Sequence, residues 1–319
     1  MNLERLGSIT SELSSNLIKS IVVPPGGLLG WFTRHRAERA RERQRVLRPE
    51  LRADDALALC MAEFPVGPVV LLGGTPVPDE AVVESIHLAG GRSIKMAIIP
   101  VAATSDPAAT SVEASRLFTR FGMKKVELFE LDSREKATSA QWCARLAEYD
   151  AVVLCGENPA QGLQVLQATL AAVTLRDMAQ VGKLIVGLDA GAAILGSRVF
   201  PGSEGEEATA GLGLLPGLLL DTAFTQCSRF SRMARAMTTD DGCYLLGTGL
   251  DSGSALVIQG GEAKVLGEAS VTFLDPRDRT AGGEELPNGL KVHLLTEGFR
   301  MNLRLRRTIA PQKREALAR

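Results

Sequence analysis

The sequence predicts an α/β fold in which a mostly parallel sheet carries helices on both faces. Three observations predict this fold. Short apolar runs alternate with amphipathic runs from Pro68 to Asp189, the apolar runs are rich in valine, isoleucine and leucine, and they end in glycine or small polar residues. Strands that are apolar throughout are buried on both faces, as in parallel sheets with helical crossovers. A chain of 319 residues, 45% hydrophobic, can build one large domain of this kind with appendages.

The predicted strands and helices alternate in order along the first half of this domain. The expected strands cover residues 68–74, 95–104, 124–131, 150–158 and 183–189. The expected helices cover residues 79–91, 106–122, 139–149 and 159–182. Glycines end several of these helices, and the segment 159–182 is long enough for a helix pair.

Ligands of open α/β sheets bind where the strands end at their carboxyl termini. Four such ends carry small or polar residues: Gly73-Gly74, Pro100 to Thr104, Gly156 to Asn158, and Asp189. We therefore expect these four segments to converge on one crevice.

The pattern changes after Gly211, where short apolar runs are separated by Gly, Asp and Ser turns. This pattern predicts antiparallel strands near the C-terminus that extend the same sheet. The domain boundaries are expected at 66–305, with an N-terminal extension over 1–65 and a basic tail over 306–319. The extension contains a predicted arginine-rich helix over 34–52, which is either a solvated helix or a contact surface for a protein partner or an anionic surface.

Composition excludes several classes of function. The formal net charge is −1 and the pI is about 6.4, so no overall field attracts nucleic acid or a membrane surface. The first apolar segment, Leu17 to Phe32, is interrupted by prolines and glycines and is too short to span a bilayer. Five scattered cysteines and the lack of a leader-like segment predict a cytoplasmic protein with reduced thiols. We found no metal or cofactor motif and expect neither.

One stretch has the spacing of a nucleophile elbow, G-x-Nu-x-G, in which a sharp strand-to-helix turn presents the central side chain. It runs from Gly187 through Leu188, Asp189 and Ala190 to Gly191. The backbone N–H of Ala190 would be one donor to an oxyanion. A serine or cysteine usually stands at the centre, and here the central residue is an aspartate.

The order of the segments and several of their motifs resemble the cyanophycinase and dipeptidase E group of serine peptidases. That group is similar in fold to class I glutamine amidotransferases, and the resemblance covers about residues 67–300. "GLDAGAA" matches the group's elbow, G-T-S-A-G-A, and "CGEN" stands where the group has G-G-D-Q. "GLGLLPGLLLDTAF" matches G-L-G-L-L-P-G followed by D-x-H-F, while "SRFSRM" and "GTGLDSGSALVI" match two later motifs.

The resemblance implies that both members of the nucleophile–base pair are replaced. Asp189 stands at the serine position and Ala223 at the histidine position. A methyl group cannot accept a proton. The third, acidic member of the triad would come from Glu204, Glu206 or Glu207. The expected function is therefore that of a pseudoenzyme: a binding or assembly protein that has lost serine-peptidase activity and keeps the fold without the chemistry.

The resemblance also implies a set of ligand-binding positions. They are Gly156, Glu157, Asn158, Ala190, Asp221, Thr222, Arg229 and Arg232, and Cys227 replaces a third arginine. Guanidinium groups suit carboxylates, so the implied ligand is acidic or peptide-like. The group often forms dimers, which predicts a homodimer.

Asp189 has three interpretations from sequence alone. In the first, its carboxylate is structural, is ionised, and accepts hydrogen bonds from the N–H groups of the following helix. In the second, it belongs to a rebuilt hydrolase site with Glu157 and Cys155 that acts on peptide or amide bonds of the β-aspartyl or cyanophycin type. In the third, Cys155 is the reactive group. His87 and His293 fall in a helix and a late strand, away from these motifs.

Overall fold

The structure is a computed structural model that describes residues 63–202, 206–239, 242–276, 280–281, 284–285 and 289–311. The predicted arginine-rich helix at 34–52 lies outside the described residues, as do Glu204 and most of the predicted tail.

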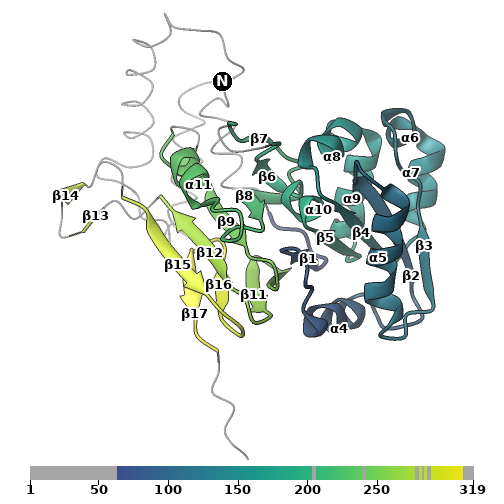
Figure 1. The fold of residues 1–319 in the computed structure, drawn as a ribbon, viewed down its shortest axis with the longest axis horizontal. Helices are drawn as coiled ribbons and strands as arrows, with labels where there is room; N and C mark the ends of the chain where they lie inside the picture. The colour runs from purple at the N-terminus through teal and green to yellow at the C-terminus, as the bar shows by residue number, and fades with distance from the viewer. Residues whose placement is uncertain are drawn as a thin grey trace, which may run out of the picture. The chain divides into compact units, whose positions relative to one another are not determined.

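A nine-stranded sheet forms the centre of the described domain (Figure 1). Its spatial order is β17 (Arg307–Ile309), β16 (Arg300–Asn302), β11 (Glu262–Leu266), β10 (Ala255–Gln259), β1 (Val69–Leu72), β5 (Leu184–Leu188), β4 (Ala151–Gly156), β2 (Lys95–Ala102) and β3 (Lys125–Leu128). The last five strands are parallel to one another, and the first four are antiparallel additions. The predicted α/β class and the parallel half of the sheet are thus confirmed.

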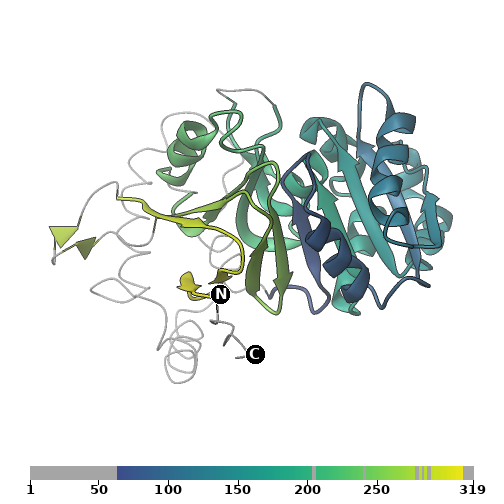
Figure 2. The same cartoon turned by 60° about the horizontal axis from the view of Figure 1, so that its bottom comes forward.

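Helices cover the parallel strands on both faces (Figure 2). One face is covered by α4 (Asp79–Leu88) and α5 (Pro107–Thr119), and the other by α6 (Arg134–Thr138), α7 (Ala140–Ala147), α8 (Pro159–Leu166) and α9 (Leu170–Gln180). Each face has its own apolar core: Phe118 lies in one and Leu146 in the other, both completely buried. The segment 159–182 is a helix pair because the chain breaks at Gln167 and the Thr169 side chain caps α9.

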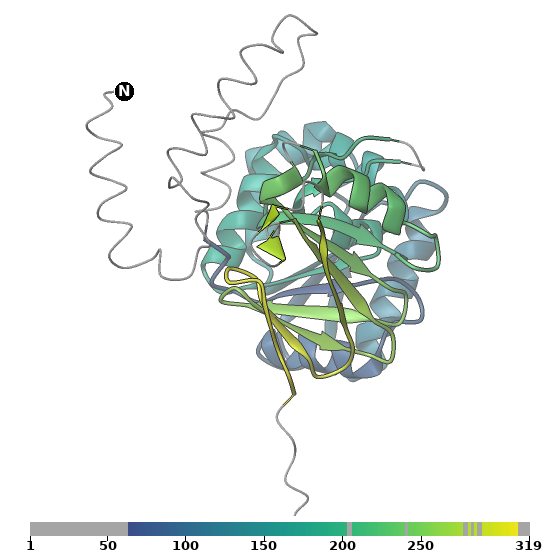
Figure 3. The same cartoon turned by 90° about the vertical axis from the view of Figure 1, so that its left-hand side faces the viewer.

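The expectation that all late strands extend one sheet is wrong for part of them. A second, six-stranded sheet has the order β15 (Lys291–Leu295), β12 (Val271–Asp275), β9 (Leu246–Leu250), β8 (Leu215–Thr222), β6 (Gly196–Val199) and β7 (Thr209–Ala210) (Figure 3). Within it, β8 is parallel to both β6 and β9. A separate apolar cluster under α11 (Phe230–Met237) explains this sheet, because Phe224, Met233 and Leu274 pack together there.

A turn after β9 moves the chain from the second sheet to the first. The N–H of Ser254 donates to the carbonyl of Asp251 at 3.0 Å, and β10 starts at the next residue beside β1. The remaining described strands, β13 (Thr280–Ala281) and β14 (Glu284–Glu285), form a two-stranded hairpin.

The domain continues past residue 305. Arg306 is buried and donates to the Asp275 carboxylate at 2.5 Å, and β17 pairs with β16. Both lie in the segment that composition alone assigns to a basic tail. Among the described residues, none of the helices has the length and apolar character needed to cross a membrane.

Candidate active site

The turn between β5 and the short helix α10 (Ala190–Ala193) has the form of a nucleophile elbow. Asp189, the central residue, has φ 53° and ψ −121°, a conformation that residues with a side chain rarely adopt. Its N–H donates to the carbonyl of Leu72 at 2.9 Å, and its own carbonyl accepts the N–H of Ala192 at 2.8 Å. These bonds hold the turn in a strained conformation of the kind found at active sites.

The two glycines of the elbow are required by the crowded backbone. A Cβ on Gly187 would lie 2.4 Å from the Cα of Ala192, and a Cβ on Gly191 would lie 2.1 Å from the carbonyl oxygen of Leu154. Any side chain at either position would collide with main-chain atoms. The elbow therefore keeps its geometry although its central residue is an aspartate.

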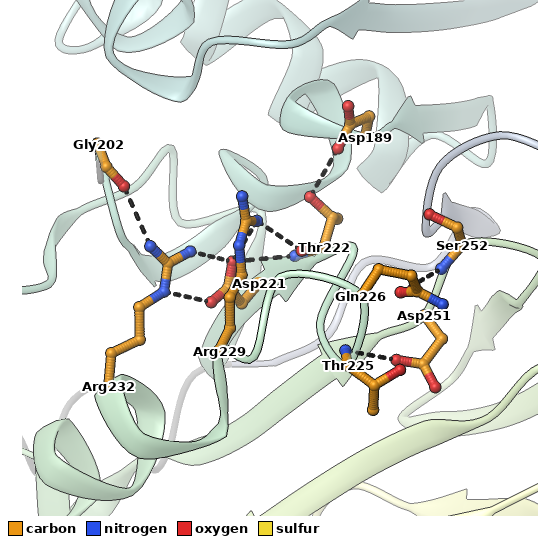
Figure 4. A network of polar contacts seen from close by, with 10 residues as sticks. All are labelled: Asp189, Gly202, Asp221, Thr222, Thr225, Gln226, Arg229, Arg232, Asp251 and Ser252. Carbon is orange, nitrogen blue, oxygen red and sulfur yellow. Dashed lines mark hydrogen bonds and ion pairs between the residues drawn. The ribbon is translucent and has the colours of Figure 1, made fainter. Parts of the chain in front are cut away.

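The Asp189 carboxyl does not cap the following helix, contrary to the structural interpretation of the sequence. Its Oδ1 instead accepts a hydrogen bond from the Thr222 hydroxyl at 2.8 Å (Figure 4). Burial raises the pKa of Asp189, the Thr222 bond and Arg229 lower it, and Glu157 and Asp221 raise it again. The net shift is upward. The environment disfavours the anion, so the expectation of a stabilised carboxylate is also wrong.

Ala223 lies directly after the strand end that reaches the elbow. Its N–H donates to the carbonyl of Gly73 at 3.1 Å, and its φ of 45° is in the left-handed region. The preceding Thr222 is 2% exposed and bonds to Asp189, which places position 223 beside the elbow. A methyl group thus occupies the place where a base is needed.

Neither described histidine reaches this place. His87 is exposed in the last turn of α4, a helix that begins near the carboxyl end of β1 and runs back along the sheet for about 15 Å. His293 is on β15, which is separated from β8 by β12 and β9. Three strand spacings amount to roughly 14 Å. Both positions agree with the sequence interpretation of these two residues.

Asp221 organises the neighbouring arginines (Figure 4). Arg232 donates to both of its oxygens, from Nε at 2.8 Å and from Nη2 at 2.6 Å, and Arg229 donates to Oδ1 at 3.0 Å. Arg229 also donates to the carbonyl of Thr222 at 2.5 Å, and Arg232 to the carbonyl of Gly202 at 3.1 Å. Phe200 packs against the Arg232 guanidinium, 4.6 Å from the ring centroid. The cluster joins the residue 202 segment to the end of β8.

The two arginines differ in their access to a ligand. The Arg232 side chain is 5% exposed and its donors are used within the protein, whereas the Arg229 side chain is 27% exposed. Arg229 is therefore better placed to meet a ligand, and the role implied for Arg232 stays a prediction.

Glu157 brings a second carboxylate into the surroundings of Asp189 from the turn after β4. Its Oε1 accepts from the N–H and hydroxyl of Thr104, at 2.9 and 2.6 Å, and from the N–H and hydroxyl of Ser105, both at 3.3 Å. Desolvation raises the pKa of Glu157, but these hydrogen bonds outweigh it and lower the pKa to about 2. Glu157 is a fixed anion.

Gly156 and Asn158 support the Glu157 turn. A Cβ on Gly156 would lie 2.1 Å from the carbonyl carbon of Ala102, so the β2 and β4 ends can approach only through a glycine. The Asn158 N–H donates to the Ala102 carbonyl at 2.9 Å, and its side chain caps α8 through the Gln161 N–H at 3.3 Å. Asn158 is therefore already engaged in a structural role.

Cys155 is not available as a nucleophile. It is completely buried, and its Sγ lies 3.7 Å from the carbonyl oxygen of Ile99. Burial and the charge of Glu157 raise the pKa of Cys155 to about 12. The thiolate is the reactive form, so the structure removes Cys155 from the rebuilt site that the sequence allowed.

Sequence reasoning missed the residues that hold the segments around the elbow in place. Thr104 and Ser105 hold Glu157, and Asp251 holds the loop after Ala223. Asp251 accepts the Thr225 N–H at 2.9 Å and the Ser270 hydroxyl at 2.6 Å. Asp251 stands in the "GTGLDSG" motif. This motif is the one feature of the sequence that could have identified it as a site residue. Within the described ranges, no group of three or more His, Cys, Asp or Glu side chains could hold a metal ion.

Comparisons with known proteins agree with these features. The family model "Peptidase family S51" matches residues 70–266. Cyanophycinases from Trichormus variabilis and Nostoc sp. are each 30% identical over 241 residues, which cover 70% of this chain and 80% of theirs. A cyanophycinase from Synechococcus elongatus is 29% identical over 234 residues, covering 68% and 72%. The crystal structure of a peptidase from an acI-B1 Actinobacterium superposes on this chain with a TM-score of 0.58 at 19% sequence identity. The superposition covers 77% of this chain and 97% of that peptidase, and it supports the fold.

We predict that Gly191→Ala destabilises the protein by ~3 kcal/mol, because the new Cβ meets a backbone carbonyl that cannot move freely. The control is Gly182→Ala, whose Cβ meets no atom within 4 Å but whose φ is +94°. That change should cost only ~1 kcal/mol. Urea unfolding measures both, and equal losses would contradict the assigned crowding.

We predict that Asp189→Asn stabilises the protein at neutral pH. The pKa of Asp189 is raised in the folded state. Below the unfolded-state pKa of about 4, the carboxyl is protonated in both states and ionisation costs no stability. As pH rises through the folded-state pKa, the wild-type protein loses stability because the carboxyl must ionise where it is buried. The amide keeps the Thr222 bond without a charge. The free energy of unfolding, variant minus wild type, should increase between pH 4 and pH 8. Asp177→Asn, on the exposed side of α9, is the control, and an increase of equal size in it would contradict the prediction.

We predict that Arg232→Met costs about 3–5 kcal/mol, because it leaves the buried Asp221 carboxylate without its bidentate partner. Arg229→Met should cost less, since this side chain is partly exposed and Asp221 then keeps Arg232. Chemical denaturation of the two variants gives the comparison. The reverse order would show that Arg229 is the main counter-charge.

Proposed function

This chain belongs to peptidase family S51, and from that premise we propose that it lacks serine-peptidase activity and acts as a binding or assembly protein. One observation carries the proposal. The elbow is intact, but its centre is a carboxyl held by Thr222, and the adjacent base position is Ala223. The scaffold for the reaction is kept and the pair that would perform it is replaced.

Attack on an amide needs a nucleophile that becomes more reactive when a base removes its proton. Asp189 has no such step: its anion is a weak nucleophile toward an amide carbonyl, and the mixed anhydride formed would collapse back. Burial raises the pKa of Asp189, so its surroundings do not favour the anion. No described histidine lies near enough to activate water for a second step. These points support the loss of the acyl-enzyme route.

The charges around the elbow suit a peptide-like ligand that carries charges of both signs. Glu157 keeps its negative charge throughout the physiological pH range. Arg229, partly exposed, supplies a guanidinium on the β8 side of the elbow. We assign Glu157 to a cationic group of the ligand and Arg229 to a carboxylate. This assignment refines the acidic or peptide-like ligand expected from the sequence.

A second candidate function is hydrolysis of peptide or amide bonds by a rebuilt site. One observation favours it: the pKa of Asp189 is raised while that of Glu157 is lowered to about 2. Carboxyl pairs whose pKa values are driven apart occur where one acts as acid and the other as base. Cys155 takes no part in this version, because it is buried and protonated.

Activity assays separate the two candidates. We expect the wild-type chain not to hydrolyse cyanophycin, β-aspartyl-arginine or α-aspartyl peptides. The double variant Asp189→Ser with Ala223→His should hydrolyse at least one of them, since the elbow is preserved and histidine tolerates a positive φ better than most residues. The two single variants are the controls. Wild-type turnover that Asp189→Ala abolishes would overturn the proposal and support the rebuilt site.

Binding is measured separately by calorimetry with β-aspartyl-arginine as the probe. Glu157→Gln should weaken binding about tenfold or more, the usual effect of removing one charge-assisted hydrogen bond. Glu113→Gln, an exposed change on α5, is the matched control. Unchanged affinity in the Glu157 variant would remove Glu157 from the ligand site.

A further inference from the structure

An open groove lies between α9 and the segment that follows β7 (Figure 1). Its volume is about 460 Å³, and none of the residues of the candidate active site lines it. The walls are the turn at 168–169, the first two turns of α9, and Gly211 with Leu212. Two apolar side chains of α9 that line it, Leu170 and Val173, are 41% and 44% exposed. The groove is therefore an apolar surface that the rest of the domain leaves accessible.

The groove has one charged side chain in its lining, Arg176. Its Nη2 donates to the carbonyl of Leu212 at 3.0 Å, which fixes the guanidinium across the groove from α9. A guanidinium has five N–H donors, and no carboxylate of the described residues forms an ion pair with this one. A fixed guanidinium with unused donors is suited to a carboxylate.

The surroundings of the groove are also positive. Arg134 of α6 donates to the carbonyl of Gln167, the residue before the groove turn, at 2.9 Å. Like Arg176, it forms no ion pair with a described carboxylate. The groove also lies at the N-terminal end of α9, the positive end of the helix dipole. Asp177 does not line the groove. An occupant with negative charge beside apolar side chains is therefore favoured.

The backbone of the strand-like wall has little left to offer a partner strand. The N–H groups of Gly211 and Leu212 donate at 3.0 and 2.8 Å to carbonyls in the segment 194–197. The carbonyl of Ala210 accepts the side-chain amide of Gln167 at 2.9 Å, and that of Leu212 accepts the guanidinium described above. Strand addition depends on free main-chain groups. A helix makes its own main-chain hydrogen bonds, so the groove suits a helix better than a strand.

We propose that this groove binds an amphipathic helix of a partner protein, in which acidic residues flank the apolar stripe. Apolar side chains three and four residues apart lie on one face of such a helix and pack on Leu170 and Val173. A carboxylate at the edge of the stripe pairs with Arg176. This proposal concerns the α9 groove and does not rest on the proposed function.

A designed peptide tests the recognition. The probe is a fluorescein-labelled helical peptide of about 14 residues, or four turns, with leucines three and four residues apart and glutamates beside them. A second peptide carries lysine in place of each glutamate, and a third alternates leucine and glutamate as a strand would. Fluorescence anisotropy should give an affinity for the first that is at least about tenfold tighter than for the other two. Equal binding of the lysine or the alternating peptide would overturn the proposal, and so would no binding of the acidic helix at about 1 mM.

Variants of the chain place the binding in the groove. Val173→Asp should weaken binding of the acidic helix at least about tenfold, because it puts a like charge on the apolar wall. Val181→Asp is the matched control, the same change at the exposed C-terminal end of the same helix. Arg176→Met should weaken binding about tenfold, and Arg116→Met, on the exposed side of α5, should not. Equal losses in the controls would contradict the proposal. Thermal unfolding checks that each variant is folded.

Two other occupants are separated by the same variants. If a second copy of this chain filled the groove, sedimentation equilibrium would show a lower mass for Val173→Asp than for Val181→Asp, and that result would overturn the proposal. If the groove took a small carboxylate with an apolar chain, decanoate would displace the acidic helix at equal concentration, with the same consequence. We expect equal masses for the two variants and no displacement by decanoate.

Discussion

The crowded turn at the end of β5 is the constraint on which the site depends. Gly187 and Gly191 allow backbone atoms to approach within distances that no side chain permits, and Asp189 is held at a positive φ between them. This geometry is set by main-chain contacts with Leu72, Leu154 and Ala192. Because none of these contacts involves the central side chain, that residue can change without loss of the elbow. A scaffold for acyl transfer can therefore persist after its nucleophile is replaced.

The charges around the elbow are arranged in two layers. The inner layer is the Asp221 cluster, in which one buried carboxylate is matched by two guanidinium groups. It holds the end of β8, and through Thr222 it reaches the Asp189 carboxyl. The outer layer is the pair of carboxyl groups after β4 and β5: Glu157, whose pKa is lowered, and Asp189, whose pKa is raised. The inner layer holds the end of β8, the outer layer carries the proposed ligand contacts, and Arg229 interacts with the carboxyl groups of both.

The proposed loss of peptidase chemistry depends on proton transfer, which a methyl group at position 223 cannot support. A binding or assembly protein does not need that step. It needs only the fold around the elbow, which the described domain keeps.

The sequence by itself determined the alternation of strands and helices, the elbow, the family and the replacement of its nucleophile and base. These are local patterns, or motifs whose order along the chain is enough to identify them. Only the tertiary structure decided that the late strands divide between two sheets, that Thr222 rather than α10 bonds to Asp189, that Arg232 is buried against Asp221, and that Cys155 is a protonated thiol. Each of these depends on residues brought together from distant segments, and burial and hydrogen bonding between such residues are set by packing that no local pattern records.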